Sequence, residues 1–257
     1  MFKQLTELTS RKWISKLTGE FSQSSASKAL IPRFAKIYNI NIDEAEKELH
    51  DYRTLNEFFT RRLKQDARPI HQEEHVVVSP VDAVITACGP ITNHHLLEVK
   101  GQSYSVVDLL QSEEDAKRYD NGYFYVLYLS PTDYHRIHTP ISGEITLRKH
   151  LAGKVYPVNN ASMTMMKQVL NRNERLITFI KSEKQKEVAV VKVGALNVSS
   201  INYVNADATT CSIGDELAYF AFGSTVVLLF EANSFTPFNT NALNSRVKMG
   251  EKLGILN

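Results

Sequence analysis

The chain has 257 residues, of which 23% are charged and 43% hydrophobic, and this balance excludes a disordered or low-complexity protein. The formal net charge of +2 gives no electrostatic indication of nucleic-acid binding, so we expect no nucleic-acid partner. Two cysteines, Cys88 and Cys211, are too few for a disulfide framework, and we expect free thiols in a reducing compartment. The longest apolar runs, such as residues 123–129, are far shorter than the roughly 18–20 residues that span a bilayer.

The first 40 residues form a basic segment on a nearly neutral body. Seven Lys and Arg against two Glu give this segment a charge of +5, which leaves about −3 for residues 41–257. We expect amphipathic helices here, with a serine-rich break at 22–27 and a second helix at 28–38 that Pro32 interrupts. A basic amphipathic helix with a Trp suits an anionic membrane interface. Packing of the same helix on its own domain is the alternative, and the pattern alone favours it.

Two short helices are predicted next. The first covers residues 42–50. The second begins at Thr54, where Thr54-Leu55-Asn56-Glu57 has the spacing of a capping box, and we expect it to continue through Leu63. Arg68-Pro69 then ends the helical region, because the residue before proline disfavours helical backbone.

From residue 75 onward the pattern changes to short β-rich runs punctuated by Gly, Pro, Asn and Asp. These runs cover residues 76–78, 84–86, 123–129, 143–147, 188–193, 198–203 and 225–230. One helix is expected at 106–117, and another is possible near 163–170. The predicted fold class is therefore α+β, a mostly antiparallel β core of sandwich or barrel type with helices gathered at the N-terminus.

Two histidines in one short segment are the first candidates for chemistry. His135 and His138 follow the apolar run 123–129 and are bracketed by Pro131 and Pro140, so the segment is predicted to be a loop. A His-x-x-His pair could bind a metal, but zinc needs further ligands, and no suitable spacing of Cys or carboxylates accompanies it. We therefore predict no metal site, and by itself the pair is more often structural than catalytic.

Asp82 and Ser224 are weaker candidates when each is taken alone. Asp82 lies at a turn that leads into an apolar strand, a common position for a turn-forming Asp. Ser224 follows Gly223 directly before the apolar run 225–230, and a glycine there permits close approach to its carbonyl. An ordinary turn into a buried strand explains both equally well.

Taken together, in the order Asp, His, Ser, these residues lie in a series of blocks that resembles the prokaryotic phosphatidylserine decarboxylase family. The blocks are residues 56–64 with 68–70, 79–82, 129–140, 156–159, 173–175, 193–198 and 214–217 before 222–225. The most diagnostic are Tyr-His-Arg-Ile-His at 134–138 and the Gly-Ser-Thr that begins at Gly223. Two positions depart from the family pattern: Ala83 stands where Gly is usual, and Phe222 where bacterial members usually have Leu.

The resemblance implies that the chain cuts itself and makes its own cofactor. In the family pattern, Ser224 Oγ attacks the carbonyl of Gly223, and the peptide is released as a large subunit, 1–223, and a small subunit, 224–257. The former Ser224 becomes a covalent pyruvoyl group. Decarboxylation of an amino acid needs such an electron sink, which no ordinary side chain supplies.

The resemblance also assigns roles to the other candidates. Serine is a poor nucleophile until a base activates it, and His138 is the family-matched base with Asp82 as its orienting carboxylate. His135 is the family-matched proton donor for decarboxylation.

The implied activity is that of a carboxy-lyase. It converts phosphatidylserine to phosphatidylethanolamine and CO2 through a Schiff base with the pyruvoyl group. A lipid substrate gives the basic segment 1–40 a purpose, namely docking on the anionic cytoplasmic side of the cell membrane as a peripheral protein, with 41–257 as the catalytic domain. The family also leads us to expect a homo-oligomer, most simply a dimer.

Three alternatives stay open at this point. A pyruvoyl-dependent decarboxylase of a soluble amino acid would cleave itself but would not need the basic segment. A Ser-His-Asp hydrolase would keep Ser224 intact and react with a fluorophosphonate probe. A non-enzymatic lipid-binding module would neither cleave itself nor release CO2. The intact mass of the purified protein separates most of these.

Overall fold

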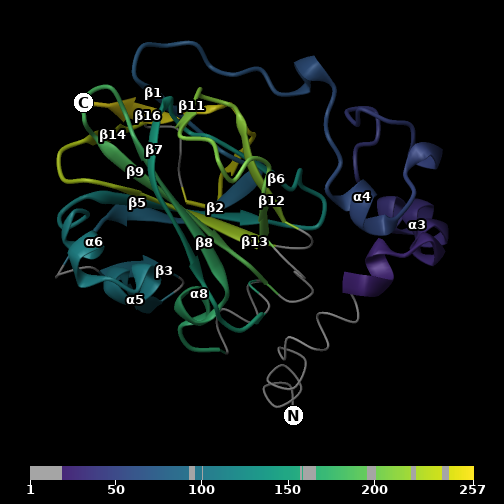
Figure 1. Ribbon diagram of the computed structural model, residues 1–257, viewed down its shortest axis with the longest axis horizontal. Coiled ribbons are helices and arrows are strands. Elements are labelled where there is room, and N and C mark those ends of the chain that lie inside the picture. The colour runs from purple at the N-terminus through teal and green to yellow at the C-terminus, as the bar shows by residue number, and fades with distance from the viewer. Residues whose placement is uncertain are drawn as a thin grey trace.

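A large β body carries a smaller helical part on one side (Figure 1). The computed structural model describes residues 19–92, 96–99, 101–156, 158, 166–195, 201–220, 224–238 and 243–257. Within them both cysteines, Cys88 and Cys211, are free thiols, as expected. No helix among the described residues is long and apolar enough to cross a membrane.

An antiparallel sheet of eight strands organises the body. Its order is β11 (Thr210–Cys211), β7 (Gly143–Leu151), β8 (Arg175–Lys181), β9 (Glu187–Val193), β13 (Ser224–Phe230), β5 (Tyr123–Leu129), β2 (Ala83–Pro90) and β15 (Arg246–Val247). Smaller antiparallel sheets join β10 (Ile201–Tyr203), β12 (Glu216–Phe220) and β6 (Arg136–His138), then β1 (Val76–Val78), β16 (Lys252–Leu256) and β14 (Phe235–Pro237), and then β3 (Leu96–Val99) and β4 (Gln102–Ser105). The predicted α+β class with an antiparallel β core is confirmed.

The central strands are apolar on both faces, because each face is covered. Successive side chains of a strand point to opposite faces. From β13, Val227 and Leu229 enter a core with the helices α5 (Val106–Leu110), α6 (Glu113–Lys117) and α8 (Val169–Arg172). Val226 and Leu228 enter a second core with residues of β6, β12 and β16. The strand β13 is therefore fully buried, and it lies between β5 and β9.

The N-terminal part is built from short helical turns: helical backbone at 19–23, η1 (Ser25–Leu30), α3 (Ile31–Ile37), η2 (Leu49–Asp51), α4 (Leu55–Phe59) and η3 (Gln65–Ala67). Ile31 and Ala35 pack with Tyr52, Leu55 and Phe58 in a separate small core. The described portion of the basic segment therefore does pack on its own protein. The predicted helix at residues 1–17 lies outside the described residues.

Several predicted helices have different boundaries. Residues 42–50 form no helix apart from the start of η2, and Ala45 instead makes an isolated bridge with Leu63. Thr54 is the N-cap of α4 as predicted, but the helix ends at Phe59 and the Glu57 carboxylate accepts the N–H of Arg53.

Two more helix predictions were wrong in detail. The helix expected at 106–117 divides into α5 and α6, because Gln111 adopts left-handed backbone and Ser112 caps a new helix. Pro32 does not interrupt its helix; it lies in the first turn of α3, where a missing N–H costs nothing. Of the possible helix at 163–170, the described part contains only the start of α8.

The strand predictions did better. The run 123–129 is β5, and β1, β2, β7, β9 and β13 occupy or extend their predicted positions. For the run 198–203 the structure describes β10 at its end, and residues 196–200 lie outside the described part. The strands β8 and β12, among others, were not predicted.

Candidate functional site

One end of the eight-stranded sheet gathers two of the predicted residues, Ser224 and Asp82. The strand β5 ends at Leu129, and Ser224, the first residue of β13, is its partner in the register. On the other side of β5, Val84 pairs with Tyr128. The N-terminal ends of β13 and β2 thus flank the C-terminal end of β5. Asp82, which precedes β2, lies at the same sheet end as Ser224, about 10 Å away across two strand spacings.

The two histidines follow β5 from this same end. The backbone N–H of His138 donates to the carbonyl of Pro80 at 2.8 Å, which ties β6 to the turn that carries Asp82. The carbonyl of His135 accepts the N–H of Phe220, the last residue of β12. The described chain stops at Phe220, beside His135, and resumes at Ser224. Residues 221–223, which include the predicted cleavage-site residue Gly223, lie outside the described part.

Ser224 is fully buried. Side chains two residues apart on a strand point to the same face. Ser224 therefore faces the same core as Val226 and Leu228. The Oγ atom has no hydrogen-bond partner within the described residues. A buried hydroxyl is normally paired, so an unpaired one is a place to look for chemistry.

His138 is held in the neutral form, with hydrogen-bond partners at both ring nitrogens. Its Nδ1 donates to the carbonyl of Gly214 at 2.7 Å, which places the proton on Nδ1, and its Nε2 accepts from the hydroxyl of Tyr134 at 3.0 Å. Burial lowers the pKa of His138. A neutral imidazole with its lone pair on Nε2 is the form that a general base requires.

His135 is completely buried against an aromatic ring. Its ring centroid lies 4.0 Å from that of Phe59, and its Nδ1 donates to the carbonyl of Asp133 at 2.8 Å. Burial lowers the pKa of His135 to about 3. The Nε2 atom makes no hydrogen bond with any described residue. His135 is therefore neutral and presents an unused lone pair.

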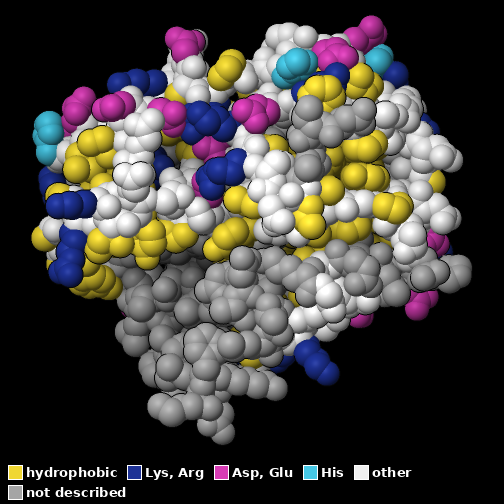
Figure 2. All heavy atoms as spheres, turned by 180° about the vertical axis from the view of Figure 1, so that it is seen from behind, with side chains coloured by type: hydrophobic (Ala, Val, Ile, Leu, Met, Phe, Trp, Pro, Cys, Tyr) yellow, Lys and Arg dark blue, Asp and Glu magenta, His cyan; other side chains and the backbone are white. Residues whose placement is uncertain are grey.

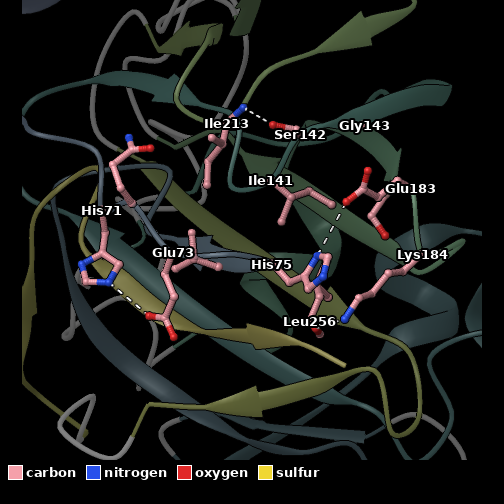
Figure 3. Close-up of a pocket in the computed structure, with 13 residues that line it drawn as sticks. His71, Glu73, His75, Ile141, Ser142, Gly143, Glu183, Lys184, Ile213 and Leu256 are labelled. Carbon is pink, nitrogen blue, oxygen red and sulfur yellow. Dashed lines mark hydrogen bonds and ion pairs between the residues drawn. The ribbon is translucent and has the colours of Figure 1, made fainter.

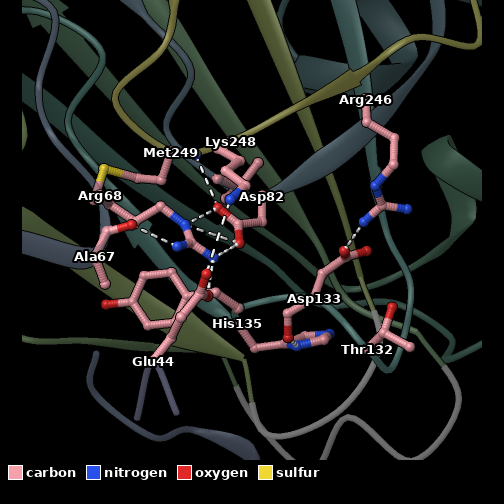
Figure 4. A network of polar contacts seen from close by, with 12 residues as sticks. Glu44, Ala67, Arg68, Asp82, Thr132, Asp133, His135, Arg246, Lys248 and Met249 are labelled. Atoms are coloured by element: carbon pink, nitrogen blue, oxygen red, sulfur yellow. Dashed lines mark hydrogen bonds and ion pairs between the residues drawn. The ribbon is translucent and has the colours of Figure 1, made fainter. Parts of the chain in front are cut away.

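Asp82 has partners that the sequence did not indicate. Arg68 Nε donates to its Oδ1 at 2.9 Å and Arg68 Nη2 to its Oδ2 at 2.5 Å, while the N–H of Met249 donates to Oδ1 at 2.9 Å (Figure 4). Arg68 also binds Glu44 at 2.8 Å. Among the described contacts none joins Asp82 to His138. In a Ser-His-Asp triad the carboxylate accepts the Nδ1 proton of the histidine, and here the backbone carbonyl of Gly214 accepts it instead. The structure thus brings the predicted residues to one sheet end without an Asp82–His138 hydrogen bond.

A second carboxylate fixes the loop that carries the histidines. The N–H and the hydroxyl of Ser130 both donate to Asp133 Oδ2 at 2.7 Å, and Arg246 forms an ion pair with Asp133. Figure 4 shows Arg246 reaching the loop from one side while Arg68 and Asp82 meet on the other. An ion pair therefore joins the loop to the part of the chain that follows Ser224.

A separate cavity lies at the opposite end of the sheet. It has a volume of about 440 Å³, and its lining includes the polar residues His71, His75 and Lys184 (Figure 3). It adjoins the start of β7 and the end of β8, whereas Ser224 lies level with the other ends of these strands. None of the predicted site residues lines it, and the described residues contain no cluster that could hold a metal.

A buried serine whose hydroxyl has no described partner and two neutral histidines thus come from one end of the sheet, and these are the groups that nucleophilic attack by a serine on an acyl group requires. A family model described as phosphatidylserine decarboxylase matches residues 55–255, and the chain belongs to this family. It is 46% identical over 254 residues to the phosphatidylserine decarboxylase proenzyme of Geobacillus kaustophilus, covering 99% of this chain and 96% of the relative. It is 44% identical over 253 residues to the proteins of the same name from Bacillus thuringiensis and Bacillus cereus, covering 98% of this chain and 96% of each relative.

Proposed function

We propose that this chain is a proenzyme that cuts itself between Gly223 and Ser224 and then, as a carboxy-lyase, converts phosphatidylserine to phosphatidylethanolamine and CO2. The observation that carries the proposal is the buried, unpaired Oγ of Ser224 at the head of β13, in a chain that belongs to this family. The names of the relatives, which are called proenzymes, support the maturation step.

Self-cleavage begins with proton transfer from Ser224 Oγ to Nε2 of His138. A bond forms between Oγ and the carbonyl carbon of Gly223, the peptide C–N bond breaks, and the new amine of residue 224 takes the proton. Loss of the Cα proton then breaks the Cβ–Oγ bond and releases 1–223 as a carboxylate. Hydrolysis of the remaining dehydroalanine releases ammonia and leaves a pyruvoyl group at the head of 224–257.

The surroundings of Ser224 fit this outcome. Its Oγ makes no hydrogen bond within the described residues, so loss of the hydroxyl breaks no described hydrogen bond. The pyruvoyl carbonyl supplies the electron sink that decarboxylation of an α-amino acid requires.

His135 begins this reaction without a proton on Nε2. Its proton is on Nδ1, which donates a hydrogen bond to the backbone carbonyl of Asp133. A phosphatidylserine amine arrives as an ammonium group and must lose a proton before it can act as a nucleophile. We assign the capture of that proton to Nε2 of His135, which then returns it to the α-carbon after CO2 has left. Because an ammonium carboxylate becomes an ammonium group and CO2, the whole reaction consumes one further proton, which solvent supplies when the product amine is released.

Asp82 contributes charge and position in this proposal. Its carboxylate lies close enough to favour the protonated form of His138 electrostatically, while Arg68 and Met249 hold it in place. The negative charge of Asp82 stabilises the imidazolium of His138 that forms when Ser224 loses its proton.

We also propose that residues 1–40 dock the enzyme on anionic membrane as a peripheral protein on the cytoplasmic side. Five of the large apolar side chains exposed in the described residues lie between 21 and 42: Phe21, Leu30, Ile37, Tyr38 and Ile42. Lys28, Arg33 and Lys36 are exposed among them. Figure 2 shows hydrophobic, Lys and Arg side chains together on the part of the surface that α3 and α4 form. Removal of 1–40 should reduce flotation with anionic liposomes, most strongly at low salt.

The decisive experiment is the intact mass of the purified protein, with and without Ser224. The wild-type chain should give two fragments, the smaller with a blocked N-terminus, and release CO2 from phosphatidylserine. Ser224→Ala should remain one chain of 29.1 kDa and be inactive. An unprocessed wild-type chain that reacts with a fluorophosphonate would point to a hydrolase instead, and activity on free serine to a soluble substrate. Sedimentation of the mature enzyme tests the expected homodimer.

A further inference from the structure

A second cavity, of about 200 Å³, lies between the helical part and the loop that carries the histidines. Tyr52 and four cationic side chains line it: Lys47, Arg61, Arg62 and Arg136. Two carboxylates, Glu46 and Glu57, are also on its wall. The cavity is not one of the sites that the sequence predicted.

Three of these cations already have carboxylate partners. Lys47 binds Glu57 at 2.7 Å, while Arg62 and Arg136 share Glu216 at 3.1 and 2.9 Å. Their charges are compensated within the protein, so they do not by themselves require a ligand.

Arg61 differs from the other three. It is only 4% exposed, and within the described residues no carboxylate forms an ion pair with it. Its Nε and Nη1 have no hydrogen-bond partner there, and Nη2 reaches the carbonyls of Thr132 and Asp133 only at 3.5 Å, the limit of a hydrogen bond. A buried guanidinium with unused donors is costly unless an anion completes its shell.

Tyr52 adds a second unused donor on the same wall. Its side chain is 2% exposed, and its hydroxyl makes no hydrogen bond of normal geometry with a described residue. Arg61 and Tyr52 therefore both hold unused donors at the wall of the cavity, and a turn of each side chain toward the cavity would bring these N–H and O–H groups to one acceptor-rich ligand.

This cavity adjoins the candidate catalytic site. The carbonyl of Asp133 that Arg61 approaches at 3.5 Å also accepts the Nδ1 proton of His135 at 2.8 Å. Phe59, two residues before Arg61, packs its ring on that of His135. A ligand group on Arg61 is thus separated from His135 by one peptide carbonyl.

We propose that Arg61 and Tyr52 form an anion subsite for the headgroup phosphodiester of the lipid substrate. The assignment rests on the proposed function for the identity of the lipid, whereas the anion site rests on the contacts alone. The substrate has two anionic groups, and the phosphate is the better occupant. A cation on the carboxylate would stabilise the charge that decarboxylation removes and so slow the reaction, whereas a cation on the phosphate binds a group that does not change.

The test uses Arg61→Gln and Tyr52→Phe, with Arg53→Gln as an exposed arginine control from the same segment. Each protein is first scored for self-cleavage, which reports folding. With short-chain phosphatidylserine, Arg61→Gln should raise KM about tenfold or more and Tyr52→Phe severalfold, because each removes a hydrogen bond to a charged group. Arg53→Gln should keep the wild-type KM.

Competition and calorimetry with soluble anions identify the occupant. Glycerophosphoethanolamine and inorganic phosphate should bind the wild-type protein, compete with the substrate, and lose affinity about tenfold in Arg61→Gln, while acetate should not compete. Tyr52→Phe keeps the test valid if Arg61→Gln fails to fold.

Three outcomes would overturn the proposal. Fully cleaved variants with wild-type KM and wild-type phosphate affinity would remove the subsite. Acetate that competes through Arg61 would assign the cavity to the carboxylate, and binding of inorganic phosphate without the diester would make it a free-phosphate site. If the wild-type protein released no CO2, the proposed function would fail, while calorimetry with the diester and with phosphate would still judge the anion site.

Discussion

Asp82 and Arg68 form a buried ion pair whose members are only 8% and 7% exposed, next to the proposed base. Removal of one charge from such a pair leaves the other buried and unpaired, which costs about 3–5 kcal/mol. We therefore expect Arg68→Gln, which leaves Asp82 without its cation, to lower the free energy of unfolding by about that amount. Asp82→Asn should lower it by less, because Arg68 keeps its ion pair with Glu44, and both variants should slow self-cleavage. Urea unfolding and a timed gel assay measure the two effects. The exposed pair His150–Glu174 is the control, since His150→Gln should change stability by less than about 1 kcal/mol. Normal cleavage in a stably folded Asp82→Asn would deny the carboxylate its proposed role.

The protonation of His138 sets the pH dependence of self-cleavage. Burial lowers its pKa below the usual 6.5, so the free base predominates at neutral pH and is lost only as pH falls through the lowered value. The cleavage rate of newly refolded precursor should therefore stay level from pH 8 to pH 6.5 and decline only below that range. Tyr134→Phe, which removes the hydroxyl that donates to Nε2, should leave this profile in place. A rate that halves near pH 7.5 would contradict a histidine base of lowered pKa.

Burial of His135 links folding to pH. Its pKa is about 3 in the folded protein against 6.5 for an exposed histidine, so the unfolded chain binds the extra proton between these values. The stabilisation is complete above pH 6.5 and is lost as pH falls toward 3, at up to about 1.4 kcal/mol per pH unit. Urea unfolding at pH 7 and pH 5 should differ by about 2 kcal/mol more in the Ser224→Ala precursor than in its His135→Gln variant. His50→Gln, at a side chain 82% exposed, is the control and should not alter the difference.

At the scale of turns, the carbonyl of Gly214 holds the proposed base, and its backbone has φ of +84°. A Cβ there would strain the turn by about 1–2 kcal/mol and lie 2.8 Å from Cδ1 of Ile70, so Gly214→Ala should displace the carbonyl and slow self-cleavage. Gly101 is a matched control, since it has φ of +70° and nothing within 4 Å of an added Cβ. Gly101→Ala should show the strain in a melting curve but cleave at the normal rate. Equal cleavage in the two variants would show that the Gly214 carbonyl does not orient His138.

The elements that the sequence predicted are those whose local signals agree. Residues 123–129 form an unbroken apolar run, and the strand β5 has those boundaries. The strand β8 was missed because Arg175 and Thr178, which are polar, are fully buried in it, and Arg175 satisfies its charge with backbone carbonyls such as that of Leu109. The break between α5 and α6 depends on the left-handed backbone of Gln111, a residue type that carries no such preference.

In the candidate site, too, some features could be predicted from the sequence and others could not. Family blocks identified Asp82, His135, His138 and Ser224, and the strand register places Asp82 and Ser224 at one sheet end. The groups that contact them are backbone carbonyls, which leave no local pattern in a sequence, and Arg68, which lies in a family block that does not indicate its pairing with Asp82. A carbonyl such as that of Gly214 belongs to every residue, so only the fold shows which one faces His138.

For the whole molecule, the position of the predicted cut has consequences for assembly. Residues 224–257 supply β13 at the centre of the main sheet, β15 at its edge, and β14 and β16 of a smaller sheet. They also supply Met249, which binds Asp82, and Arg246, which binds Asp133. The proposed small subunit therefore contributes a strand with hydrogen-bonded neighbours on both sides and helps to hold the catalytic loop.

It follows that the cut should not separate the subunits. Withdrawal of β13 would break its ladders to both β5 and β9 and expose side chains that are fully buried, such as Val227 and Leu228, each worth about 1.5–3 kcal/mol. Cleaved enzyme should elute from a sizing column at the position of uncleaved Ser224→Ala, with both fragments in every fraction. Only denaturant should part them, in the same transition that abolishes activity. Release of the small fragment in native buffer would mean that the strand order around β13 does not survive maturation. The contacts of Arg246 and Met249 with the candidate site would then be lost as well.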